Sequence, residues 1–367
     1  MEPTNTHIKE HYGLITNDTR TTQFNFLISP PKNRQPPQKH DLVIIDHPTE
    51  GENTQIIAEI TEINSYEEIA GTTIGERIGK LLATTKILTA INTTQPNQPT
   101  KPLLTPPNPG SRVYMPYNHF IETLYKQAPN GKPYQTPLHI GKTTTTAITN
   151  QNTNQPINIH IDQPHLTATH TLISATDGNG KTTLSKTITT QLQNQTTTII
   201  DPNNEYTTKN TQTTPATTEP AAIIKKIKPN QTLTITAENQ TQTQKTQNYT
   251  NILHTIAKAT AEKTTPPMLL IIEEADTLPA QALLEVTTPK NGIAAILITN
   301  HPAALHPKIL NQTQTQLIGK TTNPADLAIM QNMIKPNTQD LTALGRGEFI
   351  LASTNIIYPT KIHATPP

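Results

Sequence analysis

Residues 172–188, LISATDGNGKTTLSKTI, join an apolar strand-like run, a glycine-rich turn and a helix-like stretch. Gly180, Lys181 and Thr182 complete the pattern G-x-x-x-x-G-K-[ST], and Ala175 stands at its first glycine position. Glycines without a Cβ let backbone N–H groups approach a phosphate closely, and the following helix N-terminus adds a positive dipole end. A glycine turn that merely precedes Lys-Thr is the alternative. The flanking strand and helix favour a phosphate-binding P-loop.

A P-loop assigns a role to each residue of this segment. Lys181 would reach the β- and γ-phosphates of ATP, and the Thr182 hydroxyl would hold Mg²⁺. Asp177 is unusual, because its negative charge would lie close to phosphate unless the side chain points away. The predicted ATP-binding residues are Ala175, Asp177, Gly178, Asn179, Gly180, Lys181, Thr182 and Thr183.

A second acidic segment, MLLIIEEAD at residues 268–276, is an apolar run that ends in carboxylates. This is the form of a Walker B element, in which Glu273 would hold Mg²⁺ through water and Glu274 would polarise the attacking water. Asp276 is the alternative metal residue. An ordinary strand end followed by an acidic helix turn is the other interpretation, and the P-loop disfavours it.

Two further strand-like runs end in polar residues. Asp201 and Glu205 follow the run at residues 197–200, and Asn300 follows the run at residues 294–299. In open α/β sheets, ligands bind at the carboxyl ends of the strands. We therefore expect Asn300 to contact the γ-phosphate or the water as a sensor, with a polar turn before Pro302 as an equally weighted alternative.

The spacing of apolar runs changes near residue 150. Beyond it, strand-like runs alternate with helical stretches, which predicts an α/β fold with a parallel sheet over residues 151–367. Before it, short strand-like runs with turn-forming spacers predict a small barrel within residues 1–150. The strand-like runs of the second part are residues 171–174, 197–200, 233–236, 268–272, 294–299 and 316–318.

Less regular segments complete the expected organisation. The first-half runs expected to be strands are residues 12–15, 24–29, 41–46 and 55–63, followed by an apolar run at 86–91. We expect helices at residues 74–82 and around residues 119–126, and a proline-rich connector at residues 94–110. Residues 207–219 are expected to form a solvent loop, and the tail after Phe349 to add one or two strands.

Composition excludes several classes of protein. The chain has 367 residues, no cysteine and a formal net charge of +1, so disulfide frameworks, thiolate zinc sites and cysteine nucleophiles are excluded. No apolar run is long enough for a transmembrane helix, and the first residues, MEPTNTHIKEHYG, lack the apolar stretch of a secretory signal. We expect a cytoplasmic protein without a membrane partner.

These motifs, in their order, resemble those of the HerA-type DNA translocases of the FtsK/HerA group of hexameric P-loop ATPases. Residues 201–206 are similar to the family motif Asp-Pro-His-Gly-Glu-Tyr, and residues 273–276 stand where the family has Asp-Glu-Ala-His. The other similar segments are residues 170–182, 290–292, 298–302, 310–316 and 322–326. The resemblance implies a RecA-like P-loop ATPase core over residues 151–367. It also implies a HAS-barrel-like N-terminal domain with a Pro-rich connector over residues 1–150.

The sequence departs from the family pattern at three site positions. Glu273 replaces an aspartate, Asp177 replaces a threonine, and His301 replaces an arginine. The segment between Tyr206 and Met268 is also short for the family. We expect these departures to affect the rate of ATP hydrolysis and the affinity for DNA more than the fold.

The resemblance implies a homo-hexameric, DNA-dependent ATPase and helicase that moves double-stranded DNA with ATP and Mg²⁺. A NurA-like nuclease would be its partner in DNA-end resection and repair. An arginine acting on a neighbour's site is expected in such a ring, with Arg346 the first candidate and Lys320 a substitute. A surface arginine on a hairpin turn is an equally strong alternative for Arg346. Two alternatives stay open: a conjugation or genome-packaging ATPase of the same superfamily, and a nucleotide-binding scaffold with little hydrolysis.

Overall fold

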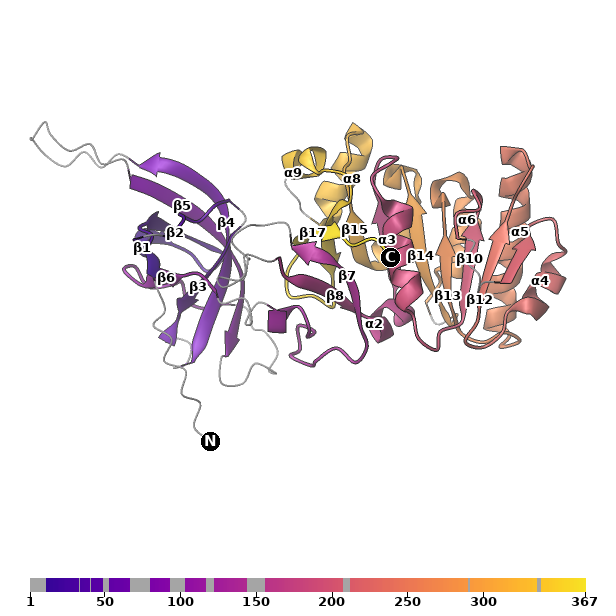
Figure 1. Ribbon diagram of the computed structural model, residues 1–367, viewed down its shortest axis with the longest axis horizontal. Helices are drawn as coiled ribbons and strands as arrows, with labels where there is room; N and C mark the ends of the chain where they lie inside the picture. The colour runs from indigo at the N-terminus through magenta and orange to yellow at the C-terminus, as the bar shows by residue number, and fades with distance from the viewer. Residues whose placement is uncertain are drawn as a thin grey trace, which may run out of the picture. The chain divides into compact units, whose positions relative to one another are not determined.

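The computed structural model describes residues 11–32, 34–39, 41–48, 53–66, 80–92, 103–116, 122–143, 156–206, 212–289, 291–334 and 338–367. The chain divides into two compact units (Figure 1). The first, called the barrel unit, contains Met1–Pro133 and Thr143–Ile157, and the second, called the sheet unit, contains Tyr134–Lys142 and Asn158–Pro367. The strand at residues 137–143 therefore lies largely in the sheet unit, although it precedes the division expected at residue 150.

The barrel unit is a closed barrel of strands in the order β1-β2-β5-β4-β3-β6, which confirms the small barrel expected from the sequence. All of these neighbours pair antiparallel. Alternate residues such as Phe24, Phe26, Val43 and Ile45 fill its interior, as the two-residue period of a strand requires. The strands are β1 (His11–Thr19), β2 (Gln23–Ile28), β3 (Leu42–Asp46), β4 (Thr54–Tyr66), β5 (Lys80–Asn92) and β6 (Arg112–Tyr114).

Two helices were predicted in this half of the chain, at residues 74–82 and around residues 119–126. The helix expected at residues 74–82 is wrong where it is described, because residues 80–82 begin β5, where Leu81 pairs with Ile28 and Ser65. Cross-strand pairing on both sides outweighs the local helical pattern. Of the helix expected around residues 119–126, residues 122–124 are helical. Residues 74–79, 94–102 and 119–121 lie outside the described part of the chain, and residues 103–110 form no helix or strand.

The sheet unit contains an 11-stranded sheet in the order β11-β12-β10-β13-β14-β9-β15-β16-β17-β7-β8. Every neighbouring pair from β11 to β15 is parallel, as expected for the α/β part of the chain, whereas β15, β16 and β17 are antiparallel neighbours. The strands are β7 (Pro137–Thr143), β8 (Asn158–Asp162), β9 (His170–Ser174), β10 (Thr197–Asp201), β11 (Gln212–Pro215), β12 (Thr232–Thr236), β13 (Met268–Ile272), β14 (Ile293–Thr299), β15 (Thr313–Ile318), β16 (Glu348–Ser353) and β17 (Thr360–Ala364).

The predicted tail strands and the predicted solvent loop both fall in the sheet unit. The expected tail strands are present as β16 and β17. The solvent loop expected at residues 207–219 is wrong over residues 212–215, which form the edge strand β11 beside β12. Residues 207–211, and Lys290 of the family-like segment 290–292, lie outside the described residues.

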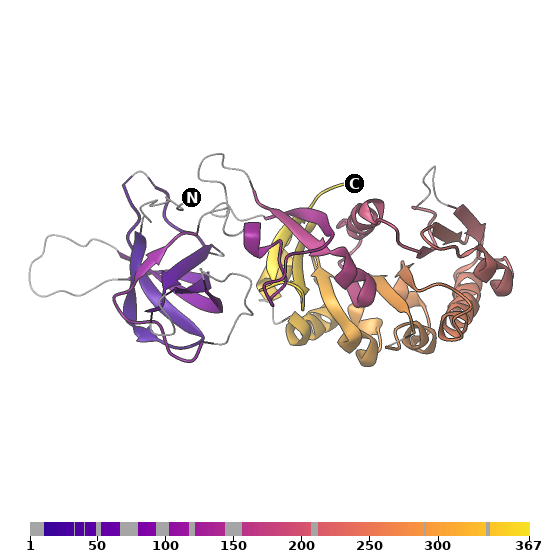
Figure 2. The same ribbon diagram turned by 90° about the horizontal axis from the view of Figure 1, so that it is seen from below.

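Helices cover both faces of the sheet. In Figure 2 the magenta helix α3 lies on one face, and the orange helices of the later chain lie on the other. Alternate strand residues such as Leu270 and Ile272 join the core beneath the later helices. The helices are α2 (Gln163–Ala168), α3 (Lys181–Gln191), α4 (Pro220–Lys226), α5 (Gln242–Ala261), α6 (Ala280–Val286), α7 (Pro307–Gln312), α8 (Pro324–Ile334) and α9 (Thr338–Ala343). Among the described helices, none combines the length and the apolar character that crossing a membrane requires.

The parallel arrangement places four strand ends along one edge of the sheet. The strands β10, β13, β14 and β9 are consecutive neighbours, and their carboxyl ends are Asp201, Ile272, Thr299 and Ser174. Because a parallel sheet aligns these ends, the loops that follow them lie together, at the place where α/β sheets bind ligands.

Candidate functional site

The predicted P-loop is a tight turn between β9 and α3. Gly178 and Gly180 both have positive φ angles, 74° and 94°, and Gly180 precedes the first residue of α3. Ala175, at the first glycine position of the template, is buried, and a Cβ on Gly319 would lie only 2.8 Å from the Cβ of Ala175. The Cβ of Ala175 is therefore accommodated because the residue facing it, Gly319 directly after β15, has no Cβ of its own.

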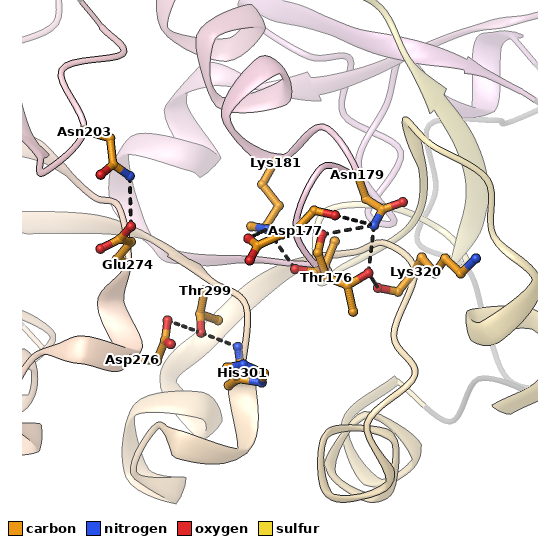
Figure 3. Close-up of polar contacts among 11 residues, drawn as sticks. Thr176, Asp177, Asn179, Lys181, Asn203, Glu274, Asp276, Thr299, His301 and Lys320 are labelled. Carbon is orange, nitrogen blue, oxygen red and sulfur yellow. Dashed lines mark hydrogen bonds and ion pairs between the residues drawn. The ribbon is translucent and has the colours of Figure 1, made fainter.

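Thr176 and Asn179 fix the shape of the loop. The backbone N–H and the hydroxyl of Thr176 donate to the carbonyl of Lys320, at 2.9 and 3.2 Å. The Asn179 amide donates to the Thr176 hydroxyl at 2.7 Å and to its carbonyl at 3.1 Å (Figure 3). Thr176 was not among the predicted site residues, and the role predicted for Lys320 was one for its side chain. That side chain extends away from Lys181 in Figure 3, whereas its carbonyl supports the loop.

Lys181 folds back over the loop. Its Nζ donates to the carbonyls of Ala175 and Thr176, at 2.9 and 3.3 Å, and lies 3.5 Å from Oδ1 of Asp177. Burial lowers the pKa of Lys181, and the neighbouring Asp177 carboxylate opposes that shift. The Asp177 side chain is 85% exposed, so the ion pair is screened by water and contributes little to stability. The Lys181 ammonium is therefore held beside the loop by two backbone carbonyls. A phosphate bound in the loop would take their place as its hydrogen-bond acceptor.

The predicted metal residues, Thr182 and Glu273, come together. Glu273 is 7% exposed, and burial raises its pKa to about 7. Hydrogen bonds from the Tyr206 and Thr182 hydroxyls lower the pKa, whereas the negative charges of Glu205 and Asp201 raise it. The P-loop threonine and the strand-end carboxylate thus share one buried polar environment.

The turn after β10 supplies Tyr206, a residue without a predicted role in the site. Asp201 is fully buried, and its carboxylate accepts from the N–H groups of Glu205 and Tyr206, at 3.0 and 2.8 Å. This turn brings the Tyr206 hydroxyl to Glu273, to which it donates at 2.5 Å. Tyr206 was visible as the last residue of the segment 201–206, but nothing in the sequence connects it to Glu273.

Glu274 has a strained backbone. Its φ and ψ are 51° and 42°, a left-handed conformation that is uncommon and costly for a residue with a Cβ. The Asn203 amide, from the turn after β10, donates to the Glu274 carboxylate at 2.8 Å (Figure 3). The strand end and this hydrogen bond together fix the predicted catalytic carboxylate.

Asp276 and His301, by contrast, belong to a network beneath the site. Thr299 donates to Asp276 at 2.7 Å and accepts from the His301 N–H at 2.9 Å. The His301 ring lies 3.3 Å from the buried carboxylate of Asp326. Of the two carboxylates, Glu273 accepts a hydrogen bond from Thr182, and the negative charges of both raise the pKa of Lys181.

Asn300 and Arg346 are the remaining predicted site residues. Asn300 follows β14, which lies between β13 and β9, so it stands between the acidic strand end and the P-loop. Its side chain is half-buried and makes no hydrogen bond within the described residues. Arg346 is exposed on a turn before β16, and the next residue, Gly347, donates to the carbonyl of Asn179 at 3.1 Å.

Comparison with known proteins gives one family and several relatives. Residues 138–320 match the family described as the central domain of the helicase HerA. A protein of Methanocaldococcus jannaschii, named as a probable DNA double-strand break repair helicase HerA, is 30% identical over 112 residues, which are 27% of this chain and 22% of that protein. The chain thus spans about a fifth of the length of that relative.

Two solved structures are similar at low identity. The genome packaging NTPase B204 of Sulfolobus turreted icosahedral virus 2, in complex with AMPPCP, is 16% identical, with a TM-score of 0.39 over 55% of this chain and 99% of that one. VirB4 of Thermoanaerobacter pseudethanolicus is 13% identical, with a TM-score of 0.47 over 64% of this chain and 96% of that one.

The family match begins in β7 and ends just after β15, so it contains the P-loop, the turn after β10 and the acidic end of β13. Its N-terminal neighbour is a closed barrel, as the resemblance implied. By its central domain, residues 138–320, this chain is a HerA-type protein.

Proposed function

We propose that this chain is an ATP-driven translocase and helicase of HerA type, which acts on double-stranded DNA as a homo-hexamer. The observation that carries the proposal is the meeting of Lys181 and Thr182, at the start of α3, with Glu273, which follows β13 and directly precedes Glu274. A P-loop cation and hydroxyl beside paired strand-end carboxylates are the groups that nucleotide hydrolysis requires.

The residues present fit Mg²⁺ held together with ATP. The hydroxyl of Thr182 and the carboxylate of Glu273 are the hard oxygen donors that Mg²⁺ prefers. Burial raises the pKa of Glu273, and a cation bound beside it would favour its charged form. Within the described part of the chain, no group of three or more His, Cys, Asp or Glu is arranged so that it could hold a metal ion. Mg²⁺ is usually bound by one or two protein ligands together with phosphates and water. The bound ion would neutralise charge on the transferred phosphate.

The other residues have separable tasks. Lys181 would bind the β- and γ-phosphates, and the N–H groups of residues 178–183 would surround them. Glu274, fixed by Asn203 and by its strand end, would orient the attacking water and accept its proton. Asn300 has an uncommitted amide between these groups and would sense the γ-phosphate.

DNA binding and assembly complete the proposal. A motor that moves along any sequence must bind phosphates and not base edges, so its affinity should fall with salt. With a net charge of +1, basic side chains must be concentrated on the DNA-binding surface. A nuclease of NurA type would act on the DNA ends that the ring delivers.

The deciding experiment measures steady-state ATP hydrolysis with and without duplex DNA. We expect turnover that requires Mg²⁺, that increases with either of two unrelated duplexes, and that is lost in Lys181→Ala. Lys308→Ala, an exposed lysine on α7, is the matched control and should keep full turnover. Turnover that does not respond to DNA, or DNA affinity that does not change with salt, would contradict the translocase.

A second candidate, a nucleotide-binding scaffold with little hydrolysis, is favoured by one contact. Asp177 lies 3.5 Å from Lys181 inside the loop, where its charge opposes an incoming phosphate. Tight ATP binding with negligible turnover, restored to turnover by Asp177→Thr, would support the scaffold over the motor.

A further inference from the structure

The turn that carries Arg346 is attached to the P-loop of its own chain. The Gly347 N–H donates to the carbonyl of Asn179 at 3.1 Å. A Cβ on Gly180 would lie 3.6 Å from the Cα of Gly347. The turn therefore touches the loop at the two residues that precede Lys181.

Hydrogen bonds hold this turn in one conformation. The Glu348 carboxylate accepts from the Gly345 N–H at 2.7 Å and pairs with Lys361 at 3.1 Å. The Gly347 carbonyl accepts from Ala364 at 2.8 Å. Gly347 has a φ of 79°, which a residue with a Cβ rarely adopts. Arg346 is thus carried on a fixed support that is anchored by β16 and β17.

The strand order shows which part of a bound nucleotide this turn would face. Glu273 and Glu274 follow β13, which is separated from β9 by β14. Arg346 precedes β16, which is separated from β9 by β15 on the opposite side. The metal and the attacking water must act at the γ-phosphate, so the reacting end lies on the carboxylate side. The opposite side of the loop is left for the α-phosphate and the nucleoside.

Arg346 itself is suited to such a contact. It is exposed, and its guanidinium has no hydrogen bond or ion pair with any of the described residues. A guanidinium carries several donors in a fixed plane, which matches phosphate oxygens and stacks on flat rings.

We propose that Arg346 binds the nucleotide held by the P-loop of its own subunit, through the α-phosphate and nucleoside end. This rests on the proposed nucleotide-binding function. It replaces the trans-acting role expected from the sequence with one in which Arg346 raises affinity and leaves the chemical step to other residues.

The test compares the binding of ATP, ADP and AMP to four proteins: wild type, Arg346→Ala, Arg346→Lys and Arg112→Ala. Arg112 is an exposed arginine on β6 of the barrel unit, so its variant loses the same charge elsewhere. We expect R346A to weaken the binding of all three nucleotides by a similar factor, on the order of tenfold or more. R346K should lose less, and R112A should match wild type.

Other outcomes separate the inference from the function on which it rests. Unchanged ADP and AMP binding with slower ATP turnover in R346A would overturn the inference alone, because it is the pattern of a residue that acts on the γ-phosphate. Absence of nucleotide binding by wild type would overturn both. A mixture of Lys181→Ala and R346A subunits, assayed at an ATP concentration too low to saturate R346A, tests which chain supplies the arginine. The inference expects no more turnover than R346A gives alone, and higher turnover in the mixture would contradict it.

Discussion

The hydroxyl of Tyr206 donates a hydrogen bond of 2.5 Å to the carboxylate of Glu273, across 67 residues of sequence. Burial and the Glu273 charge raise the pKa of Tyr206 well above its usual value, so the phenol keeps its proton and remains a donor. It therefore acts as a positioning residue for the carboxylate that we assign to Mg²⁺.

Tyr206→Phe should destabilise the protein and raise the pKa of Glu273 further, because a buried carboxylate loses a donor. We expect a loss of about 1–3 kcal/mol, larger at pH 8, where Glu273 is charged, than at pH 5. Urea unfolding at the two pH values measures it. Tyr249→Phe is the control, since its buried hydroxyl donates only a weak bond of 3.5 Å to the carbonyl of Ile235. Equal effects of the two variants would contradict the role of Tyr206.

Glu273 should also give the stability a measurable pH dependence. Its pKa is raised from 4.5 to about 7, so the folded state holds this proton more tightly than the unfolded state. Stability from this group is therefore greatest below pH 4.5 and falls as pH rises toward 7, by about 3 kcal/mol in all. Glu273→Gln should reduce that fall and be the more stable protein at pH 8. Glu262→Gln, at an exposed carboxylate, should leave the profile unchanged.

Glu274→Gln should keep ATP bound and slow its hydrolysis by about 10²- to 10⁴-fold, because the water loses its proton acceptor while the phosphate contacts remain. Single-turnover hydrolysis and nucleotide affinity, measured on the same sample, separate the two effects. Asp276→Asn is the comparison, since its carboxylate accepts a hydrogen bond from Thr299 within the sheet edge. Normal hydrolysis by the Glu274 variant would move the catalytic role to another carboxylate.

The assembly should be a closed ring, most simply of six subunits. A site completed by a neighbouring subunit requires head-to-tail contacts, and such contacts close as a ring or continue as a filament. Mass measurement by light scattering with ATP and Mg²⁺ decides the matter. A monomer at micromolar concentration would contradict the ring.

Short-range patterns were enough to predict six strands of the sheet, β9, β10, β12, β13, β14 and β15, and the glycine-rich turn after β9. The run MLLII at residues 268–272 is buried on both faces, so its composition alone indicates a central strand. The edge strand β11 was missed because only Thr214 among its four residues is buried, and its pairing with β12 sets its conformation. Residues 80–82 were wrongly assigned to a helix because the residues that pair with them lie on other strands, β2 and β4, which a local pattern does not show.

Individual residues of the candidate site could be selected from the sequence, but the contacts between them could not. Gly180, Lys181 and Glu273 follow patterns that a local reading detects. The contact of Tyr206 with Glu273, and that of Gly347 with Asn179, depend on how distant segments meet in the sheet. The support that the Lys320 carbonyl gives to Thr176 carries no side-chain signal at all.

The bond between Asn179 and Gly347 also orders events during synthesis. A ribosome releases residues 175–183 long before β16 and β17, which hold the Gly347 turn in place. Contacts so distant in sequence form late in folding, because closing the intervening loop costs entropy first. The nascent chain therefore carries the complete phosphate-loop sequence, without the contact from Gly347, while the residues up to Gly347 are still being made. That contact can form only after β16 and β17 have also been synthesised.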